Sequence, residues 1–157
     1  MILFYTQNVS FKLVGKQLLK NWIKEVIHSC ESVPGNLNFI FTNDDDLLSI
    51  NKKFLNHDYY TDIITFDTSD YISPDADVSS KINGDIYISL DTVLLNSQTY
   101  SSTFTIELYR VMIHGVLHLL GYDDISEEEQ KTMRQAENFT LSLLKNSFPD
   151  FPSQKYL

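Results

Sequence analysis

Hydrophobic residues recur along this chain with two spacings, one typical of strands and one typical of helices. Short segments rich in β-branched and aromatic residues predict four strands, at 2–8, 37–43, 62–67 and 84–90. Longer segments with apolar residues every three or four positions predict four helices with one buried face each, at 11–30, 44–55, 103–120 and from 126 onward.

Polar residues mark where two of these helices begin. Asn43 precedes three aspartates, which suit the positive end of a helix dipole. Ser126 and Glu129 have the spacing of a capping box at the start of the last helix. The polar segment 68–81 predicts a long loop between the third and fourth strands.

Strands and helices do not alternate strictly, so the sequence predicts an α+β fold and not a regular α/β fold. The 157 residues suffice for one domain, which we expect to span 1–157. This domain would contain a mixed sheet of about four strands packed with about four helices, and the tail beyond about residue 148 would be irregular.

Composition and charge limit the possible cellular location and the possible binding partners of the protein. Cys30 is the only cysteine, so no internal disulfide can form. No apolar run approaches the roughly 18–20 residues of a membrane helix, and the first residues show no secretory leader. We therefore expect a cytoplasmic protein without membrane association. The net charge of −9 argues against broad, non-specific binding to nucleic acid.

The segment "VMIHGVLHLLGYDD", residues 111–124, carries the clearest candidate chemistry. On a helix, His114 and His118 lie on one face and can bind one ion. Gly121 can turn the chain so that Asp123 or Asp124 returns towards the histidines. Two nitrogen ligands, one oxygen ligand and an open fourth position are typical of a catalytic zinc site.

The alternative is a pair of core histidines that donate to backbone carbonyls. The helix around them is apolar nearly all round, which predicts deep burial, and unpaired buried imidazoles would be destabilising by about 1–3 kcal/mol each. A metal ion removes this penalty, so the sequence favours a metal site on a buried helix. Gly115 occupies the position of the general base in H-E-x-x-H zinc peptidases, which argues against that chemistry.

Three segments resemble one protein family in the same order along the chain. The segment "HGVLHLLGYDD" is very similar to the H-G-x-L-H-L-x-G-Y-D-H signature of the YbeY family, bacterial metal-dependent endoribonucleases and rRNA maturation factors. "INKKFLNHDYYTDIITF" (50–66) and "GDIYIS" (84–89) resemble two further family segments. The resemblance implies that His114, His118 and Asp124 bind one Zn²⁺ or another divalent metal, with Asp123 as the alternative third ligand.

The sequence departs from the family pattern at three positions. Asp124 stands where the family usually has histidine, although aspartate is also a competent zinc ligand. Leu55 replaces an arginine suited to phosphate contact, which puts the mode of RNA binding in question. Tyr60 replaces a proline and is expected to affect only the local turn.

The family resemblance implies a single-strand-specific endoribonuclease in rRNA maturation and ribosome quality control. A metal-activated water would attack an RNA phosphodiester, and no side chain is assigned as a further catalytic group. The expected partners are rRNA precursors and the ribosome or its proteins, without DNA. Two alternatives remain: a non-catalytic ribosome- or RNA-associated factor with a structural metal site, and, more weakly, a zinc peptidase.

Several other residues have both a functional and a purely structural interpretation. Asp62 and Asp85 could orient the histidines, or could serve only in turns at strand ends. His28 and His57 receive no role. A further set of basic and aromatic residues could bind RNA, or could simply face solvent: Lys12, Lys16, Lys20, Lys24, Lys52, Lys53, Tyr59 and Tyr60.

Overall fold

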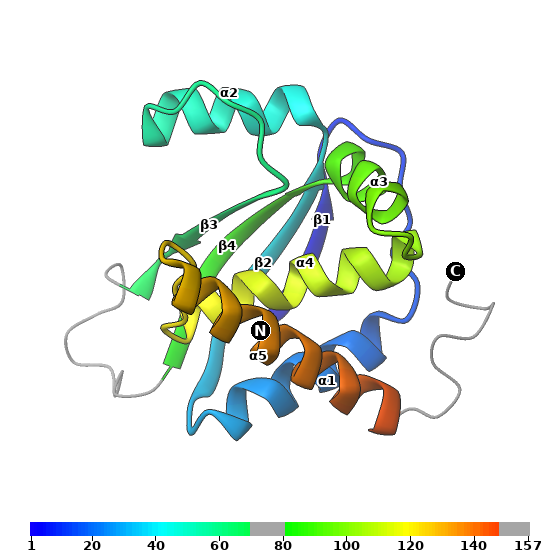
Figure 1. The fold of residues 1–157 in the computed structure, drawn as a ribbon, viewed down its shortest axis with the longest axis vertical. Helices are drawn as coiled ribbons and strands as arrows, with labels where there is room; N and C mark the ends of the chain where they lie inside the picture. Colours follow the sequence, from blue (N-terminus) through cyan, green and yellow to red (C-terminus); the bar gives the residue numbers. More distant parts are fainter. Residues whose placement is uncertain (70–80, 148–157) are drawn as a thin grey trace.

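The computed structural model describes residues 1–69 and 81–147, which form four strands and five helices (Figure 1). The strands are β1 (Ile2–Thr6), β2 (Val33–Thr42), β3 (Ile63–Asp67) and β4 (Lys81–Ser89). The helices are α1 (Lys16–Ser29), α2 (Asp44–Leu55), α3 (Leu90–Thr99), α4 (Phe104–Leu119) and α5 (Glu127–Ser147). None of the described helices is long and apolar enough to cross a membrane.

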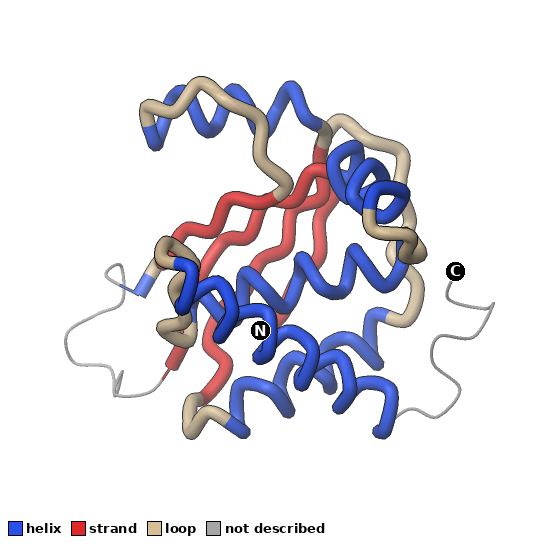
Figure 2. Tube along the Cα trace, viewed as in Figure 1, coloured by secondary structure: helices blue, strands red, loops and turns tan. Residues whose placement is uncertain are grey.

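The sheet has the strand order β1-β2-β4-β3, with β1, β2 and β4 parallel and β3 antiparallel to β4. Helices α1, α4 and α5 lie together over one face of this sheet, and α2 lies beyond its end (Figures 1 and 2). This arrangement confirms the prediction of a single α+β domain with a mixed four-stranded sheet.

Alternation along the strands determines which side chains meet the helices. Phe39 pairs with Ile86, and both are fully buried in the core beneath α4. Asp85, one position earlier on β4, therefore lies on the opposite face, where it accepts a hydrogen bond from Asn38 Nδ2 at 2.9 Å.

Helix α4 packs closely against the sheet at Gly115. A Cβ atom at this position would lie 2.9 Å from a methyl group of Ile86 and 3.0 Å from one of Ile63. The absence of a side chain therefore allows α4 to approach the sheet closely, and this close packing explains the glycine at position 115. This contact holds the histidine-bearing end of α4 against β3 and β4.

The predicted caps are present. Asn43 accepts a hydrogen bond from the Asp46 backbone N–H at 2.8 Å, as an N-cap should. Ser126 accepts from the Glu129 backbone N–H at 3.1 Å, and the Glu129 carboxylate accepts from the Ser126 N–H in return at 3.4 Å. The capping box thus begins α5.

Several elements differ from the expectations, and strand β4 begins at Lys81 and not at residue 84. The first helix begins at Lys16, not at residue 11, because Gly15 takes a left-handed conformation with φ of 75°. Strand β2 begins at Val33 and includes Pro34 and Gly35, across a register irregularity. Helix α3 was missed because its short polar-apolar pattern has only Val93 and Ser97 buried. Residues 70–80 of the expected loop and 148–157 of the tail lie outside the described residues.

Candidate metal centre

Helix α4 brings the two histidines together in its last two turns. His114 and His118 are four residues apart, and their Nε2 atoms face each other at 3.0 Å. Their side chains are 20% and 27% exposed, so they line a cavity and are less buried than the surrounding apolar sequence predicts. The two side chains are therefore partly open to the cavity.

A tight turn returns the chain after α4. Gly121 has φ of 103° and donates its N–H to the His118 carbonyl at 3.0 Å, while the Tyr122 N–H reaches the Leu117 carbonyl at 3.0 Å. This double closure is typical of a glycine-terminated helix. It directs Asp124 back towards the end of α4.

The returning carboxylate completes a triangle of donor atoms. Asp124 Oδ2 lies 3.3 Å from His114 Nε2 and 3.4 Å from His118 Nε2. An ion bound at about 2.0–2.1 Å in a tetrahedral site separates its ligand atoms by about 3.3–3.4 Å. The three donors therefore fit a zinc-sized ion. Asp123, the alternative ligand, lines a different hollow beside Gly121.

Glu137 of α5 orients His114. Its Oε2 accepts a hydrogen bond from His114 Nδ1 at 2.9 Å, and the residue is only 6% exposed. With the proton on Nδ1, Nε2 keeps the lone pair that a metal needs. Arg110 and Arg134 approach the other oxygen, Oε1, at 3.2 and 3.4 Å.

These contacts shift both pKa values. Burial acts to raise the pKa of Glu137, but the hydrogen bond and charge of His114, with the two arginines, lower it overall. Burial acts to lower the pKa of His114, but the hydrogen bond and charge of Glu137, with Asp124 and Asp62, raise it overall. The pair therefore favours a charged carboxylate beside the imidazole.

Sequence reasoning did not identify Glu137. A signal was present, because the residue follows Met133 by one helical turn and precedes Thr140 on the buried face of α5. A carboxylate on a buried face needs a partner. The sequence alone does not show that this partner is His114, which lies 23 positions earlier on another helix.

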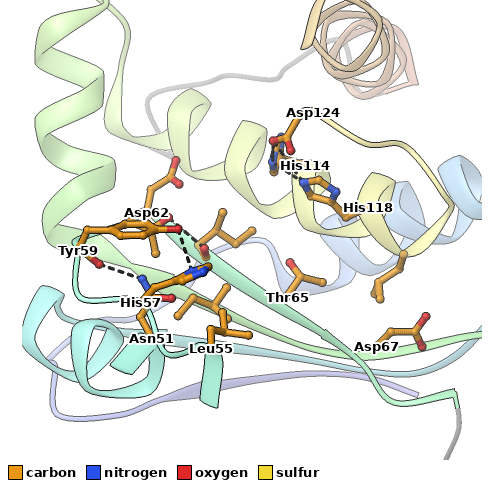
Figure 3. A pocket seen from close by; sticks show the side chains of 14 residues that line it. Asn51, Leu55, His57, Tyr59, Asp62, Thr65, Asp67, His114, His118 and Asp124 are labelled. Carbon is orange, nitrogen blue, oxygen red and sulfur yellow. Dashed lines mark hydrogen bonds and ion pairs between the residues drawn. The ribbon is translucent and has the colours of Figure 1, made fainter. Parts of the chain in front are cut away.

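A cavity of about 430 Å³ opens beside the three candidate ligands. His114, His118 and Asp124 lie on one side of it, and Leu55, His57 and Tyr59 come from the opposite side (Figure 3). Strand β3 forms the wall between them. A cavity that joins an open ligand triangle to solvent is what a catalytic metal site requires.

A second cavity, of about 270 Å³, adjoins the other side of His114. Arg110 and Arg134 line it, and both are held by the Glu137 carboxylate. Asp62 lines both cavities, and burial is the main cause that raises its pKa, partly opposed by the charge of His114. Asp62 is thus brought to the site.

The remaining candidate residues are placed as follows. Asp85 does not reach the site, since it lies on the opposite face of the sheet. Lys52 does not line the main cavity and forms an exposed ion pair with Asp58 at 3.2 Å. None of the lysines on or just before α1 lines the main cavity: Lys12, Lys16, Lys20 and Lys24. His57 lines that cavity, although no role was expected for it.

The chain is similar to known proteins over most of its length. The family model described as endoribonuclease YbeY matches residues 5–145. The endoribonuclease YbeY of Cytophaga hutchinsonii is 42% identical over 144 residues, which cover 92% of this chain and 96% of the relative. That of Parabacteroides distasonis is 38% identical over 143 residues, with coverage of 91% and 95%.

A solved structure has the same fold. The solution structure of a Thermotoga maritima protein matches with a TM-score of 0.64 and 26% identity, and it covers 98% of this chain and 95% of the other. The family match spans the signature segment that holds the three candidate ligands. By sequence and fold, this chain belongs to the YbeY endoribonuclease family.

Proposed function

We propose that this protein is a metal-dependent endoribonuclease that cleaves single-stranded segments of rRNA precursors. One observation carries the proposal: three donor atoms, His114 Nε2, His118 Nε2 and Asp124 Oδ2, converge beside an open cavity in a member of an endoribonuclease family. Nitrogen and carboxylate donors in this number suit Zn²⁺, and other divalent metals are compatible with them.

Each residue of the site has a distinct task in this proposal. His114, His118 and Asp124 hold the ion, which when bound supplies Lewis acidity and lowers the pKa of coordinated water. Glu137 keeps the His114 proton on Nδ1 and fixes the orientation of the ring. The cavity lies directly beside these ligands and is where a segment of the RNA would bind.

The proposal extends to the cellular setting. The enzyme would act in the cytoplasm on rRNA precursors, together with the ribosome or its proteins, in rRNA maturation and ribosome quality control. The family membership supports this setting. The peptidase alternative is weakened further by the packing role of Gly115, whose position has no room for a side chain that could act as a base.

A cleavage assay with defined RNA tests the proposal. End-labelled single-stranded and duplex RNAs of the same rRNA-derived sequence are incubated with wild type, with chelator, and with zinc restored. We expect cleavage of the single strand that requires metal and is lost in His114→Ala and His118→Ala. His28→Ala, at an exposed position of α1, should cleave at the wild-type rate.

Circular dichroism must first show that each variant is folded. Folded His114→Ala and His118→Ala variants that cut RNA at the wild-type rate would refute the mechanism. If wild type cuts no RNA while ribosome binding survives His114→Ala, the non-catalytic factor becomes the better interpretation.

A further inference from the structure

An aromatic pair stands across the cavity from the candidate ligands. The rings of His57 and Tyr59 stack with centroids 5.1 Å apart and an angle of 22°, and Tyr59 Oη lies 2.9 Å from His57 Nδ1 (Figure 3). Both residues line the cavity, and Tyr59 is 55% exposed. Because the two rings face each other, the pair offers its outer ring face to a further flat group, and Tyr59 remains open to solvent.

The loop that carries the pair is anchored to α2. Asn51, 2% exposed, donates its side-chain amide to the Tyr59 carbonyl at 2.9 Å. The Asn51 carbonyl in turn accepts from the His57 N–H at 3.1 Å, and Asn56 ends α2 in a left-handed conformation with φ of 53°. The two rings are thus positioned before any ligand arrives, which lowers the entropy lost on binding.

Apart from a bound metal ion, the cavity wall formed by the described residues offers no permanently cationic group to the phosphates of RNA. The described residues that line the cavity include three aspartates, Asp62, Asp67 and Asp124, and no lysine or arginine. Leu55, 41% exposed, adds an apolar surface beside the rings. The side of the cavity formed by Leu55, His57 and Tyr59 therefore matches the flat, weakly polar face of a nucleobase better than it matches a phosphate group.

We propose that His57, Tyr59 and Leu55 form a subsite in which an unpaired nucleobase of the RNA stacks beside the metal centre. The inference rests on the proposed function and identifies how the substrate is held. A base in a duplex is already paired and stacked between neighbours, so only an unpaired base can enter. The subsite would therefore select single-stranded RNA through stacking.

Equilibrium binding tests the subsite separately from cleavage. A fluorescein-labelled single-stranded RNA decamer is titrated with full-length protein in the presence of chelator, so that the RNA stays intact. Tyr59→Ala should weaken binding about tenfold to a hundredfold, the range expected for loss of one base stack. Tyr59→Phe keeps the ring and should stay within about threefold of wild type.

Tyr60→Ala is the matched control. Tyr60 is the adjacent residue, is 60% exposed and does not line the cavity, so its removal should leave the dissociation constant within about twofold of wild type. A second probe is an abasic ribose-phosphate decamer, on which wild type and Tyr59→Ala should bind equally. Equality on this probe separates stacking from a structural effect on the loop.

The outcomes distinguish this subsite from the proposed function. Tyr59→Ala binding that equals wild type on the base-containing decamer, or a loss of affinity relative to wild type that is equally large on both probes, would overturn the subsite and leave metal-dependent cleavage intact. A wild type that binds RNA with the expected loss in Tyr59→Ala but never cleaves it would overturn the nuclease activity and leave the subsite supported.

Discussion

Replacement of Glu137 by glutamine removes one charge at the centre of the site and nearly preserves its shape. The carboxylate accepts from His114 Nδ1 at 2.9 Å and from Arg110 and Arg134 at 3.2 and 3.4 Å. The glutamine side chain of Glu137→Gln has only one oxygen, which cannot accept hydrogen bonds from both His114 and the two arginines. His114 then loses the partner that fixes its proton and ring orientation.

The expected effect on metal affinity follows from this geometry. Loss of a carboxylate that orients a ligating histidine lowers affinity about 10- to 100-fold, which corresponds to about 1.4–2.7 kcal/mol. The fold should also weaken by about 1.5–3 kcal/mol, the range for hydrogen bonds to a charged group. Arg134 adds little to this sum because its side chain is 56% exposed.

A competition titration with a chromophoric zinc chelator measures the affinity, and urea denaturation of the metal-free protein measures the stability. Glu128→Gln is the matched control, since Glu128 is exposed on the first turn of the same helix. Glu137→Asp keeps the negative charge but has a side chain shorter by one methylene. Its affinity for zinc should therefore lie between the affinities of wild type and Glu137→Gln. A folded Glu137→Gln protein that binds zinc within twofold of wild type would refute the orienting role.

Three further predictions concern the packing of Gly115, the third metal ligand and the pKa of His114. Gly115→Ala should lower the free energy of unfolding by about 1–3 kcal/mol in urea denaturation, because the new methyl group meets isoleucines of β3 and β4. Asp124→Asn should lose most bound zinc by elemental analysis, whereas Asp123→Asn, whose side chain lies outside the triangle, should retain it. The raised pKa of His114 should stabilise the metal-free protein fully below the ordinary histidine pKa of about 6.5, and this stabilisation should be lost as the pH rises through the raised value. Urea denaturation at pH 6 and pH 8.5 measures it as the difference in free energy of unfolding between wild type and Glu137→Gln. A difference that is the same at both pH values would contradict the prediction.

Local features of the site could be predicted because they depend on neighbours in the chain. Helical spacing alone places His114 and His118 on one face, and a glycine three positions later allows the left-handed turn that returns Asp124. The caps at Asn43 and Ser126 follow from the same short-range rules. The α+β class followed from the order of the strand and helix patterns.

Long-range features could not be predicted from such rules. Glu137 reaches His114 only because α5 packs on α4, and His57 and Tyr59 face the ligands only because the α2–β3 loop ends across the same cavity. Asp85 was a candidate from the sequence but does not reach the site, because alternation along β4 places it on the opposite face of the sheet.

The sequence by itself therefore determined most of the elements and the two histidines of the candidate metal site, since backbone sterics and side-chain periodicity act within a few residues. Tertiary structure decided which carboxylate orients His114 and which residues face it across the cavity. These choices depend on strand order, register and helix packing, which bring together residues far apart in the chain.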